Sequence, residues 1–208
     1  MYEKMISFEA RKSLDSSRIM KKIAIFASGS GTNAQNIIEF FLDKPEVSVS
    51  LVLSNKKDAL VLERAERLKV PSFSFDRKMF YESNEILHLL KKHKIDLIVL
   101  AGFLWLVPDY LLKNYPQRII NIHPALLPKY GGKGMYGARV HESVIRQGDS
   151  ESGITIHYVN EKYDEGATIF QAKCSIDVGE SPESLARKIH KLEYEHFPEA
   201  IEKLLDGL

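Results

Sequence analysis

Short apolar runs alternate along the chain with segments in which apolar residues recur every three or four positions. The runs are bounded by glycine and polar residues, as buried strands are, and four to eight residues is the usual length of a strand. The predicted strands are 23–27, 47–53, 72–75, 96–101, 118–122, 152–159 and 168–176.

The periodic segments between these runs have the spacing of helices that bury one face. The predicted helices are 33–41, 59–68, 79–93, 110–114, 138–147 and a last one that Ser181 caps, which runs from Pro182 towards Leu205 with a break at Pro198. Strands separated by helices indicate an α/β fold. We expect a Rossmann-like, mostly parallel, twisted sheet with helices on both faces.

Residues 1–19 do not fit this alternation, because they are polar and irregular and end just before the first strand. We expect them to form an extension, disordered or peripheral, and residues 20–208 to form a single domain. The extension lacks the apolar run of a secretory signal. The chain also contains no stretch near the roughly 18 consecutive apolar residues of a membrane span.

The composition of the 208 residues, 44% apolar and 27% charged, is ordinary for a globular protein. The chain has 29 Lys and Arg against 28 Asp and Glu, a formal charge of +1, and this disfavours nucleic-acid partners, which require a strongly basic face. Cys174 is the only cysteine, so an internal disulfide and a multi-cysteine zinc site are excluded. We expect a cytoplasmic monomer or homodimer without bound metal, whose partners are small molecules rather than nucleic acid or membrane.

Open parallel sheets bind ligands at the carboxyl ends of their strands. The loops that matter here follow Ala27, Leu53, Ala101 and Ile122. The first of them, 28–33 (Ser-Gly-Ser-Gly-Thr-Asn), joins a strand to the start of a helix, where glycines let an anion approach unpaired backbone N–H groups. This loop predicts a phosphate site; the alternative is a tight turn that binds nothing.

Asn121 and His123 flank Ile122 at the end of the fifth strand. Residues two apart in a strand project to the same side, so the amide and the imidazole point together. Side by side they are able to stabilise an oxyanion, and a neutral histidine is able to act as a general base. Pro124 keeps His123 extended. The alternative is an ordinary strand end with a capping asparagine and a packed histidine.

The polar loop 159–166 carries three carboxylates, those of Glu161, Asp164 and Glu165. A carboxylate near a histidine raises the pKa of the imidazole, and it is also able to pass a proton through water. The residues alone do not choose among the three, and solvated loop acids are the simpler alternative. His157, on the strand before this loop, is a second imidazole candidate.

Several segments, taken together in their order and spacing, resemble the folate-dependent formyltransferase family. They are 27–33 (Ala-Ser-Gly-Ser-Gly-Thr-Asn), 54–56 (Ser-Asn-Lys), 100–103 (Leu-Ala-Gly-Phe), 121–130 (Asn-Ile-His-Pro-Ala-Leu-Leu-Pro-Lys-Tyr), 153–159 (Gly-Ile-Thr-Ile-His-Tyr-Val) and 164–166 (Asp-Glu-Gly). The first segment points to the glycinamide ribonucleotide branch. The resemblance covers about residues 21–205. It implies a transferase of purine biosynthesis that moves a formyl group from 10-formyltetrahydrofolate, its co-substrate, to the amine of phosphoribosylglycinamide.

The resemblance also implies roles for particular residues. Asn121 and His123 are the catalytic pair, and Asp164 is the catalytic carboxylate. The residues that hold the ribonucleotide are Gly31, Thr32, Asn33 and Glu193, which His190, one turn earlier, is able to join. The residues that bind folate are Lys78, Leu104, Trp105, Leu106, Val107 and Asn121. Trp105 departs from the family, in which a basic residue is frequent at that place.

A second departure from the family is the loop 129–137, which is longer and richer in glycine than is usual. It is either a mobile lid over the substrate or a floppy insertion, and Lys129 and Lys133 would add positive charge beside phosphate or the folate tail. The alternative functions are a tRNA or sugar-nucleotide formyltransferase, a formyltetrahydrofolate hydrolase, and a non-catalytic nucleotide-binding module on the same fold.

Overall fold

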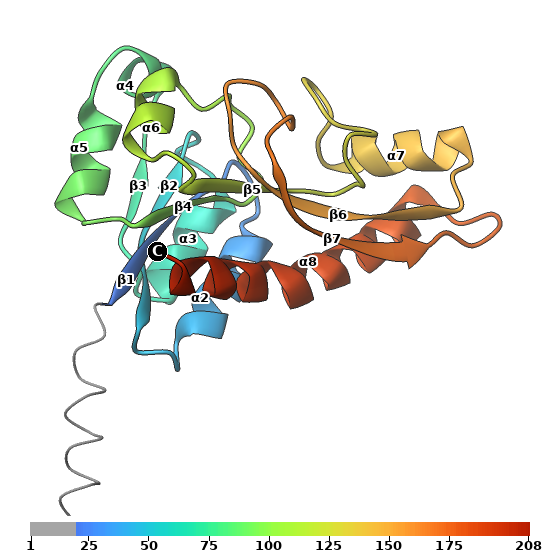
Figure 1. Cartoon of the computed structure of the whole chain (residues 1–208), viewed down its shortest axis with the longest axis horizontal. Coiled ribbons are helices and arrows are strands. Elements are labelled where there is room, and N and C mark those ends of the chain that lie inside the picture. Colours follow the sequence, from blue (N-terminus) through green and yellow to red (C-terminus); the bar gives the residue numbers. More distant parts are fainter. Residues whose placement is uncertain (1–19) are drawn as a thin grey trace, which may run out of the picture.

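The computed structural model describes residues 20–208, so the extension predicted for residues 1–19 lies outside the described part of the chain. The described residues form a seven-stranded sheet in the order β3-β2-β1-β4-β5-β6-β7. The first five of these strands are parallel, and β6 and β7 continue the sheet in antiparallel fashion. Helices lie on both faces (Figure 1), which confirms the predicted fold class.

The elements agree closely with the pattern of the sequence. The strands are β1 (Lys21–Phe26), β2 (Val47–Ser54), β3 (Ser72–Ser74), β4 (Leu97–Leu100), β5 (Ile119–His123), β6 (Glu151–Tyr158) and β7 (Thr168–Ser175). The helices are α2 (Thr32–Phe41), α3 (Leu60–Arg67), α4 (Arg77–Tyr81), α5 (Glu85–Lys92), α6 (Asp109–Asn114), α7 (Ala138–Gln147) and α8 (Pro182–Asp206). Within residues 20–208, no helix is both long enough and apolar enough to cross a membrane.

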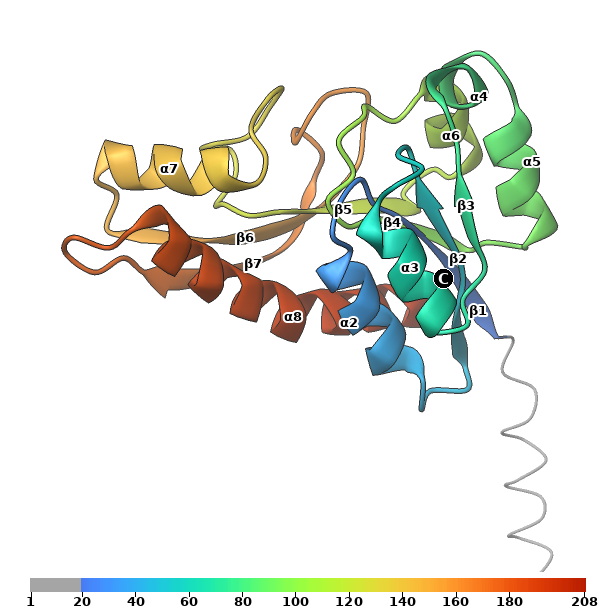
Figure 2. The same cartoon turned by 180° about the vertical axis from the view of Figure 1, so that it is seen from behind.

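The core has two halves, one on each face of the sheet. Ile23 and Ile25 of β1 belong to one half, and Ala24 and Phe26 belong to the other, because successive side chains of a strand point to opposite faces. Helices α2, α3 and α8 pack on the first half, on one side of the sheet in Figure 2. Helices α4, α5 and α6 pack on the second half. Helices therefore cover both faces of the sheet. The end of the sheet at which the parallel strands have their carboxyl ends is left to form a site.

The helix predicted over 79–93 is wrong, because the segment forms two helices, α4 and α5. The chain leaves the helical path between them, where the hydroxyl of Ser83 donates a hydrogen bond to the carbonyl of Met79 at 3.0 Å. In a continuous helix that carbonyl would accept from the backbone N–H of Ser83. The side chain replaces the backbone donor and ends the helix.

The break predicted at Pro198 is also wrong, since α8 runs unbroken through this residue. A proline removes the hydrogen bond to the carbonyl four residues earlier, here that of Tyr194. Nδ2 of Asn36, on the adjacent helix α2, donates to this carbonyl at 2.9 Å. A tertiary contact thus replaces the missing helical bond, and the helix continues.

Candidate active site

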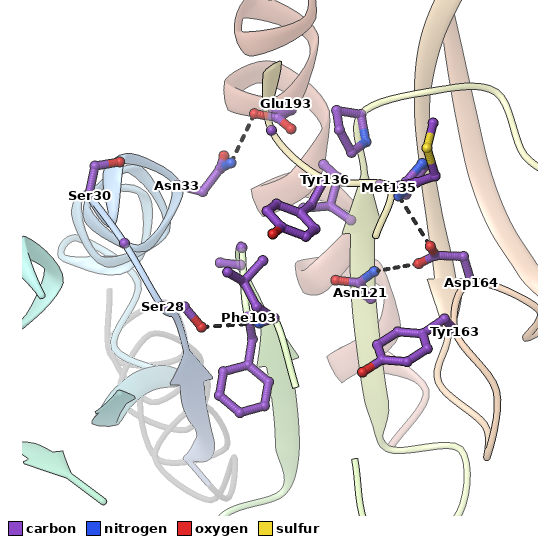
Figure 3. A pocket seen from close by; sticks show the side chains of 18 of the residues that line it. Ser28, Ser30, Asn33, Phe103, Asn121, Met135, Tyr136, Tyr163, Asp164 and Glu193 are labelled. Atoms are coloured by element: carbon purple, nitrogen blue, oxygen red, sulfur yellow. Dashed lines mark hydrogen bonds and ion pairs between the residues drawn. The ribbon is translucent and has the colours of Figure 1, made fainter. Parts of the chain in front are cut away.

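A cavity of about 650 Å³ opens at the carboxyl edge of the parallel strands. The loops after β1, β2, β4 and β5 all contribute to its wall, through 28–33, Lys56, 101–104 and 121–124. Figure 3 shows side chains from these loops facing Asp164 and the helix that carries Glu193. The cavity lies where an open parallel sheet is expected to bind its ligand.

The loop 28–33 brings all three of its predicted phosphate-binding residues, Gly31, Thr32 and Asn33, to the cavity wall. Gly31 has a φ of 74°, in the left-handed region, and precedes α2 without offering a side-chain cap. The first N–H groups of α2 are therefore available to an anion. A Cβ atom at Gly31 would lie 2.4 Å from Cγ2 of Val61 on α3, so the packing as well as the backbone requires glycine here.

Asn33 and Glu193 meet at this end of the cavity (Figure 3), where Nδ2 of the amide donates to Oε2 of the carboxylate at 3.0 Å. Nδ1 of His190 lies 2.9 Å from the same oxygen, and this hydrogen bond raises the pKa of His190. Glu193 is buried. Oδ1 of Asn33 is also buried and has no hydrogen-bond partner among residues 20–208. An unsatisfied oxygen in a cavity wall fits a ligand that carries a donor.

The side chain of Asn121 is held by two acceptors. The pairing of β5 with β6 places it opposite His157, and its Nδ2 lies 3.1 Å from Nε2 of that ring and 3.4 Å from Oδ1 of Asp164. Nδ1 of His157 lies 2.9 Å from the carbonyl of Tyr158, so in the neutral ring Nε2 is the acceptor. The amide nitrogen that we predict to stabilise an oxyanion thus faces Asp164 and His157, and the amide oxygen points away from Asp164 (Figure 3).

His123 lies buried between Tyr130 and Asp164. Its Nε2 is 2.7 Å from the carbonyl oxygen of Tyr130, and its Nδ1 is 3.5 Å from Oδ2 of Asp164. Burial lowers the pKa of His123, while the Asp164 carboxylate and the Tyr130 carbonyl act in the opposite direction and offset the effect of burial only in part. The carboxylate therefore favours the charged ring, as the sequence predicts, but burial has the larger influence.

Of the three carboxylates in the loop 159–166, Asp164 lines the cavity, whereas Glu161 and Glu165 are exposed. Glu165 pairs with Lys162 at 3.0 Å. Asp164 has a φ of 58°, in the left-handed region that few residues other than glycine adopt. Strained backbone of this kind concentrates at functional sites. The structure thus separates three residues that the sequence leaves equivalent.

The carboxylate of Asp164 has several favourable neighbours. Its Oδ2 accepts a hydrogen bond from the N–H of Gly132 at 2.9 Å, and its Oδ1 lies 3.6 Å from Nε2 of His157. Burial by itself raises the pKa of Asp164, but the nearby His157 ring, the charge of His123 and the Gly132 N–H together outweigh burial and lower it. Asp164 is therefore an ionised acceptor at the centre of the site.

The loop 129–137 forms one wall of the cavity, through 132–137. Lys133 belongs to this wall, whereas Lys129 lies outside it and pairs with Asp149 at 3.1 Å. The loop contacts the predicted catalytic residues through its backbone, at Tyr130 and Gly132. Its movement as a lid stays a prediction.

The predicted folate-binding residues divide into two groups. Leu104 and Asn121 line the cavity. Trp105 packs among the aromatic rings of the second core half, with its ring centre 6.1 Å from that of Phe75 and 5.8 Å from that of Phe80. An aromatic residue at this place thus contributes to the core, where a basic residue would not.

The other predicted folate-binding residues also lie outside the cavity wall. Val107 is buried in the second core half, and Leu106 offers its backbone carbonyl to the hydroxyl of Tyr81 at 3.0 Å. Lys78 is exposed on α4. A folate contact by Lys78, Leu106 or Val107 stays a prediction.

One wall residue, His141, has no place among the site residues predicted from the sequence. His141 of α7 is buried, and its Nδ1 has no hydrogen-bond partner among the described residues. Burial is the largest cause that lowers the pKa of His141, and the charge of His190 lowers it further. The signal in the sequence that could have identified His141 was its place on the helix face that also carries Val140 and Val144, which are buried as well. Ser28 belongs to the predicted loop 28–33, but its contact was not predicted: its buried hydroxyl accepts from the N–H of Leu104 at 3.0 Å and joins two loops of the site (Figure 3).

The sequence matches the formyl transferase family over residues 21–201. The phosphoribosylglycinamide formyltransferase of Bacillus subtilis (strain 168) is 39% identical over 191 residues, which are 89% of this chain and 95% of that protein. The chloroplastic phosphoribosylglycinamide formyltransferase of Arabidopsis thaliana is 38% identical over 187 residues, 87% of this chain. The crystal structure of phosphoribosylglycinamide formyltransferase from Streptococcus pneumoniae TIGR4 is 40% identical with a TM-score of 0.78, and covers 89% of this chain and 99% of that one.

The match extends over nearly all of the described residues and agrees with the fold. The chain therefore belongs to the formyl transferase family. It spans 64% of the length of the Arabidopsis relative and 95% of the length of the Bacillus relative. The family resemblance inferred from the motifs of the sequence is confirmed.

Proposed function

We propose that this protein transfers the formyl group of 10-formyltetrahydrofolate to the amine of phosphoribosylglycinamide, giving the N-formyl product and tetrahydrofolate in purine biosynthesis. One observation carries the proposal: Asn121, His123 and Asp164, from distant parts of the chain, converge in a cavity whose other end is the loop 28–33. Such a cavity fits a phosphorylated amine that reacts with an acyl donor. The names of the relatives support the same reaction.

The ribonucleotide fits the half of the cavity that begins at Gly31. The free N–H groups at the start of α2 suit its phosphate, as helix N-termini suit anions in general. Beside them, the carboxylate of Glu193 and the unsatisfied Oδ1 of Asn33 both accept hydrogen bonds, which suits the hydroxyl groups of a ribose. The amine at the other end of the ribonucleotide then lies towards His123.

The reaction forms a bond between the amine nitrogen and the formyl carbon and breaks the bond from that carbon to the folate nitrogen. Negative charge develops on the formyl oxygen meanwhile, and the positive charge of protonated His123 stabilises it. Asn121 adds a hydrogen-bond donor once its amide turns from Asp164 to the substrate. The proton released by the amine passes to the leaving folate nitrogen through Asp164 and an ordered water.

The alternative functions have weaker support. The relatives from Bacillus subtilis and Streptococcus pneumoniae, which align over most of this chain, are named for the glycinamide enzyme, and this disfavours tRNA and sugar-nucleotide substrates and simple hydrolysis of the folate. A non-catalytic module would have no use for a buried histidine and carboxylate 3.5 Å apart. The cytoplasmic location and the monomeric or homodimeric state stay predictions.

Formyl transfer monitored by absorbance tests the proposal. The purified protein is mixed with a 10-formyl folate and phosphoribosylglycinamide, and the loss of the formyl folate is followed with and without the amine. We expect loss of the folate only when the amine is present. Deformylation without the amine would indicate a hydrolase, and no reaction in either mixture would contradict the proposal.

A further inference from the structure

Asp149 lies outside the cavity wall but is connected to the catalytic residues through one loop. It directly follows Gly148, which ends α7 with a φ of 72°. Its Oδ2 accepts a hydrogen bond from the hydroxyl of Tyr130 at 2.9 Å, and Nζ of Lys129 lies 3.1 Å from the same oxygen. These two contacts lower the pKa of Asp149, so this carboxylate is charged at neutral pH.

Tyr130 joins Asp149 to His123. Its ring packs against the first core half, and its hydroxyl is fixed by Asp149. Its backbone has a φ of 58°, a conformation that a residue other than glycine keeps only where its surroundings hold it. In this conformation the carbonyl of Tyr130 accepts from Nε2 of His123 at 2.7 Å.

The same loop segment also reaches Asp164. The N–H of Gly132 donates to Oδ2 of Asp164 at 2.9 Å. Between the two contacts, Gly131 packs so closely that a Cβ atom there would lie 2.6 Å from Cδ2 of Leu127 and 3.2 Å from Cβ of Asp164. Segment 130–132 therefore contacts both members of the histidine–carboxylate pair, and its conformation sets how they face each other.

We propose that Asp149 is a positioning residue, which through Tyr130 holds segment 130–132 in the conformation that orients His123 and Asp164. The kinetic consequence rests on the proposed function, whereas the structural consequence does not. Small displacements of catalytic groups lower rates by up to about 100-fold. Loss of the contact between Asp149 and Tyr130 should therefore reduce turnover although neither side chain touches substrate.

The first test needs no substrate. The Tyr130 carbonyl raises the pKa of His123, so a loosened segment should lower that pKa below its value in the wild type. We expect Asp149→Ala and Tyr130→Phe each to shift the NMR titration of His123 to lower pH. Asp149→Asn keeps an acceptor for the Tyr130 hydroxyl and should restore most of the wild-type titration. An unchanged titration in Asp149→Ala and Tyr130→Phe would overturn the proposal whatever the protein's activity.

The second test is kinetic. We expect Asp149→Ala and Tyr130→Phe each to lower kcat for formyl transfer by about 10-fold to 100-fold, with KM for both substrates within about twofold. The double variant should lose no more than either single variant, because the two residues act through one contact. Additive losses, or higher KM values at unchanged kcat, would overturn the proposal.

A matched control separates positioning from general damage to this surface. Glu151 lies two residues beyond Asp149 and forms an exposed ion pair with Lys173, with Nζ and Oε1 2.7 Å apart. The variant Glu151→Ala removes this ion pair. We expect kcat and the His123 titration of this variant to equal those of the wild type. If Asp149→Ala fails to fold, Tyr130→Phe, which keeps the aromatic ring, decides the outcome by the same two measurements. A wild type without formyl transfer would refute the proposed function, and the titration would still test Asp149.

Discussion

Nδ1 of His123 lies 3.5 Å from Oδ2 of Asp164, and both side chains are nearly buried, with exposed fractions of 4% and 11%. One residue ends β5 and the other belongs to the loop after β6. Solvent screens a buried pair far less than a surface pair. The protonation of the imidazole is therefore coupled to the charge of the carboxylate.

The coupling predicts the effect of Asp164→Asn on the imidazole. The carboxylate is the largest of the influences that raise the pKa of His123, and burial, which lowers it, remains in the variant. We expect the pKa of His123 in the free protein to fall further, as measured by NMR titration. Glu165→Gln, which removes an exposed carboxylate of the same loop, is the control and should leave the titration unchanged. A higher pKa in Asp164→Asn would contradict the assigned geometry.

The buried histidines predict how stability depends on pH. Burial is the main cause that lowers the pKa of both His123 and His141 below the ordinary value of 6.5. A group whose pKa is lower in the folded state contributes stability that is present above its unfolded pKa and is lost as pH falls through its folded pKa. The free energy of unfolding should therefore decrease as pH falls below about 6.5.

Denaturant unfolding at pH 7 and pH 5.5 measures this decrease, and His141→Leu should make it smaller. His190→Gln is a control of opposite sign, because the hydrogen bond with Glu193 raises the pKa of His190. The stability that His190 contributes is present below pH 6.5 and is lost as pH rises through its folded pKa. Equal pH dependence in His141→Leu and the wild type would show that His141 does not titrate as a buried group.

The loop 28–33 contains a matched pair of glycines. A Cβ atom at Gly31 would lie 2.4 Å from a side-chain atom of Val61 and 2.7 Å from its Cα, with φ at +74°, whereas a Cβ at Gly29 would meet nothing within 4 Å. We expect Gly31→Ala to lower the free energy of unfolding by about 2–4 kcal/mol, from backbone strain and overpacking together. Gly29→Ala should change it by less than about 0.5 kcal/mol. Equal stability of the two variants in denaturant unfolding would contradict the described packing.

This packing limits what a bulky substitution at Gly31 is able to report. We predict from the sequence that Gly31→Val chiefly weakens ribonucleotide binding. The clash with Val61 means that such a variant also disturbs the packing of α3 against the loop. A test of the ribonucleotide site is therefore better made elsewhere.

The variant Glu193→Gln tests the proposed ribonucleotide site at a buried carboxylate. Glu193 joins Asn33 and His190 in the half of the cavity proposed for the ribonucleotide. Loss of hydrogen bonds to a charged group costs about 1.5–3 kcal/mol, so KM for the ribonucleotide should rise about 10-fold to 100-fold while KM for the folate stays within about twofold. Glu202→Gln, on the same helix but paired with Lys44 at the surface, should change neither. A rise in KM for the folate alone would place the two substrates the other way round.

The sequence predicts the fold well because its signals are local. Apolar runs such as 96–101 and helical spacing such as that of 138–147 depend on a few neighbouring residues, and both segments form the expected elements. The two wrong helix predictions have different causes: the Ser83 hydroxyl ends α4 through a contact only four residues long, whereas the helix at Pro198 depends on a contact that no local pattern shows. The bond from Asn36 to Tyr194 that lets α8 pass Pro198 joins residues far apart in the chain.

The sequence predicts only the part of the site that local spacing determines. The spacing of Asn121 and His123 within one strand places them together, but the residues leave the choice among three loop carboxylates open. The backbone at Gly132 contributes an N–H group and the backbone at Tyr130 contributes a carbonyl, which side-chain motifs do not encode. His141 reaches the cavity because α7 lies against α8, a tertiary relation.

The most direct test of the proposed chemistry is the turnover of Asp164→Asn and His123→Ala beside the wild type, with phosphoribosylglycinamide and a 10-formyl folate. Removal of a group that stabilises developing charge typically costs about 10²-fold to 10³-fold in kcat. We predict losses of that size in both variants with little change in the affinity for either substrate. Near-normal turnover in either variant would contradict the roles assigned to His123 and Asp164.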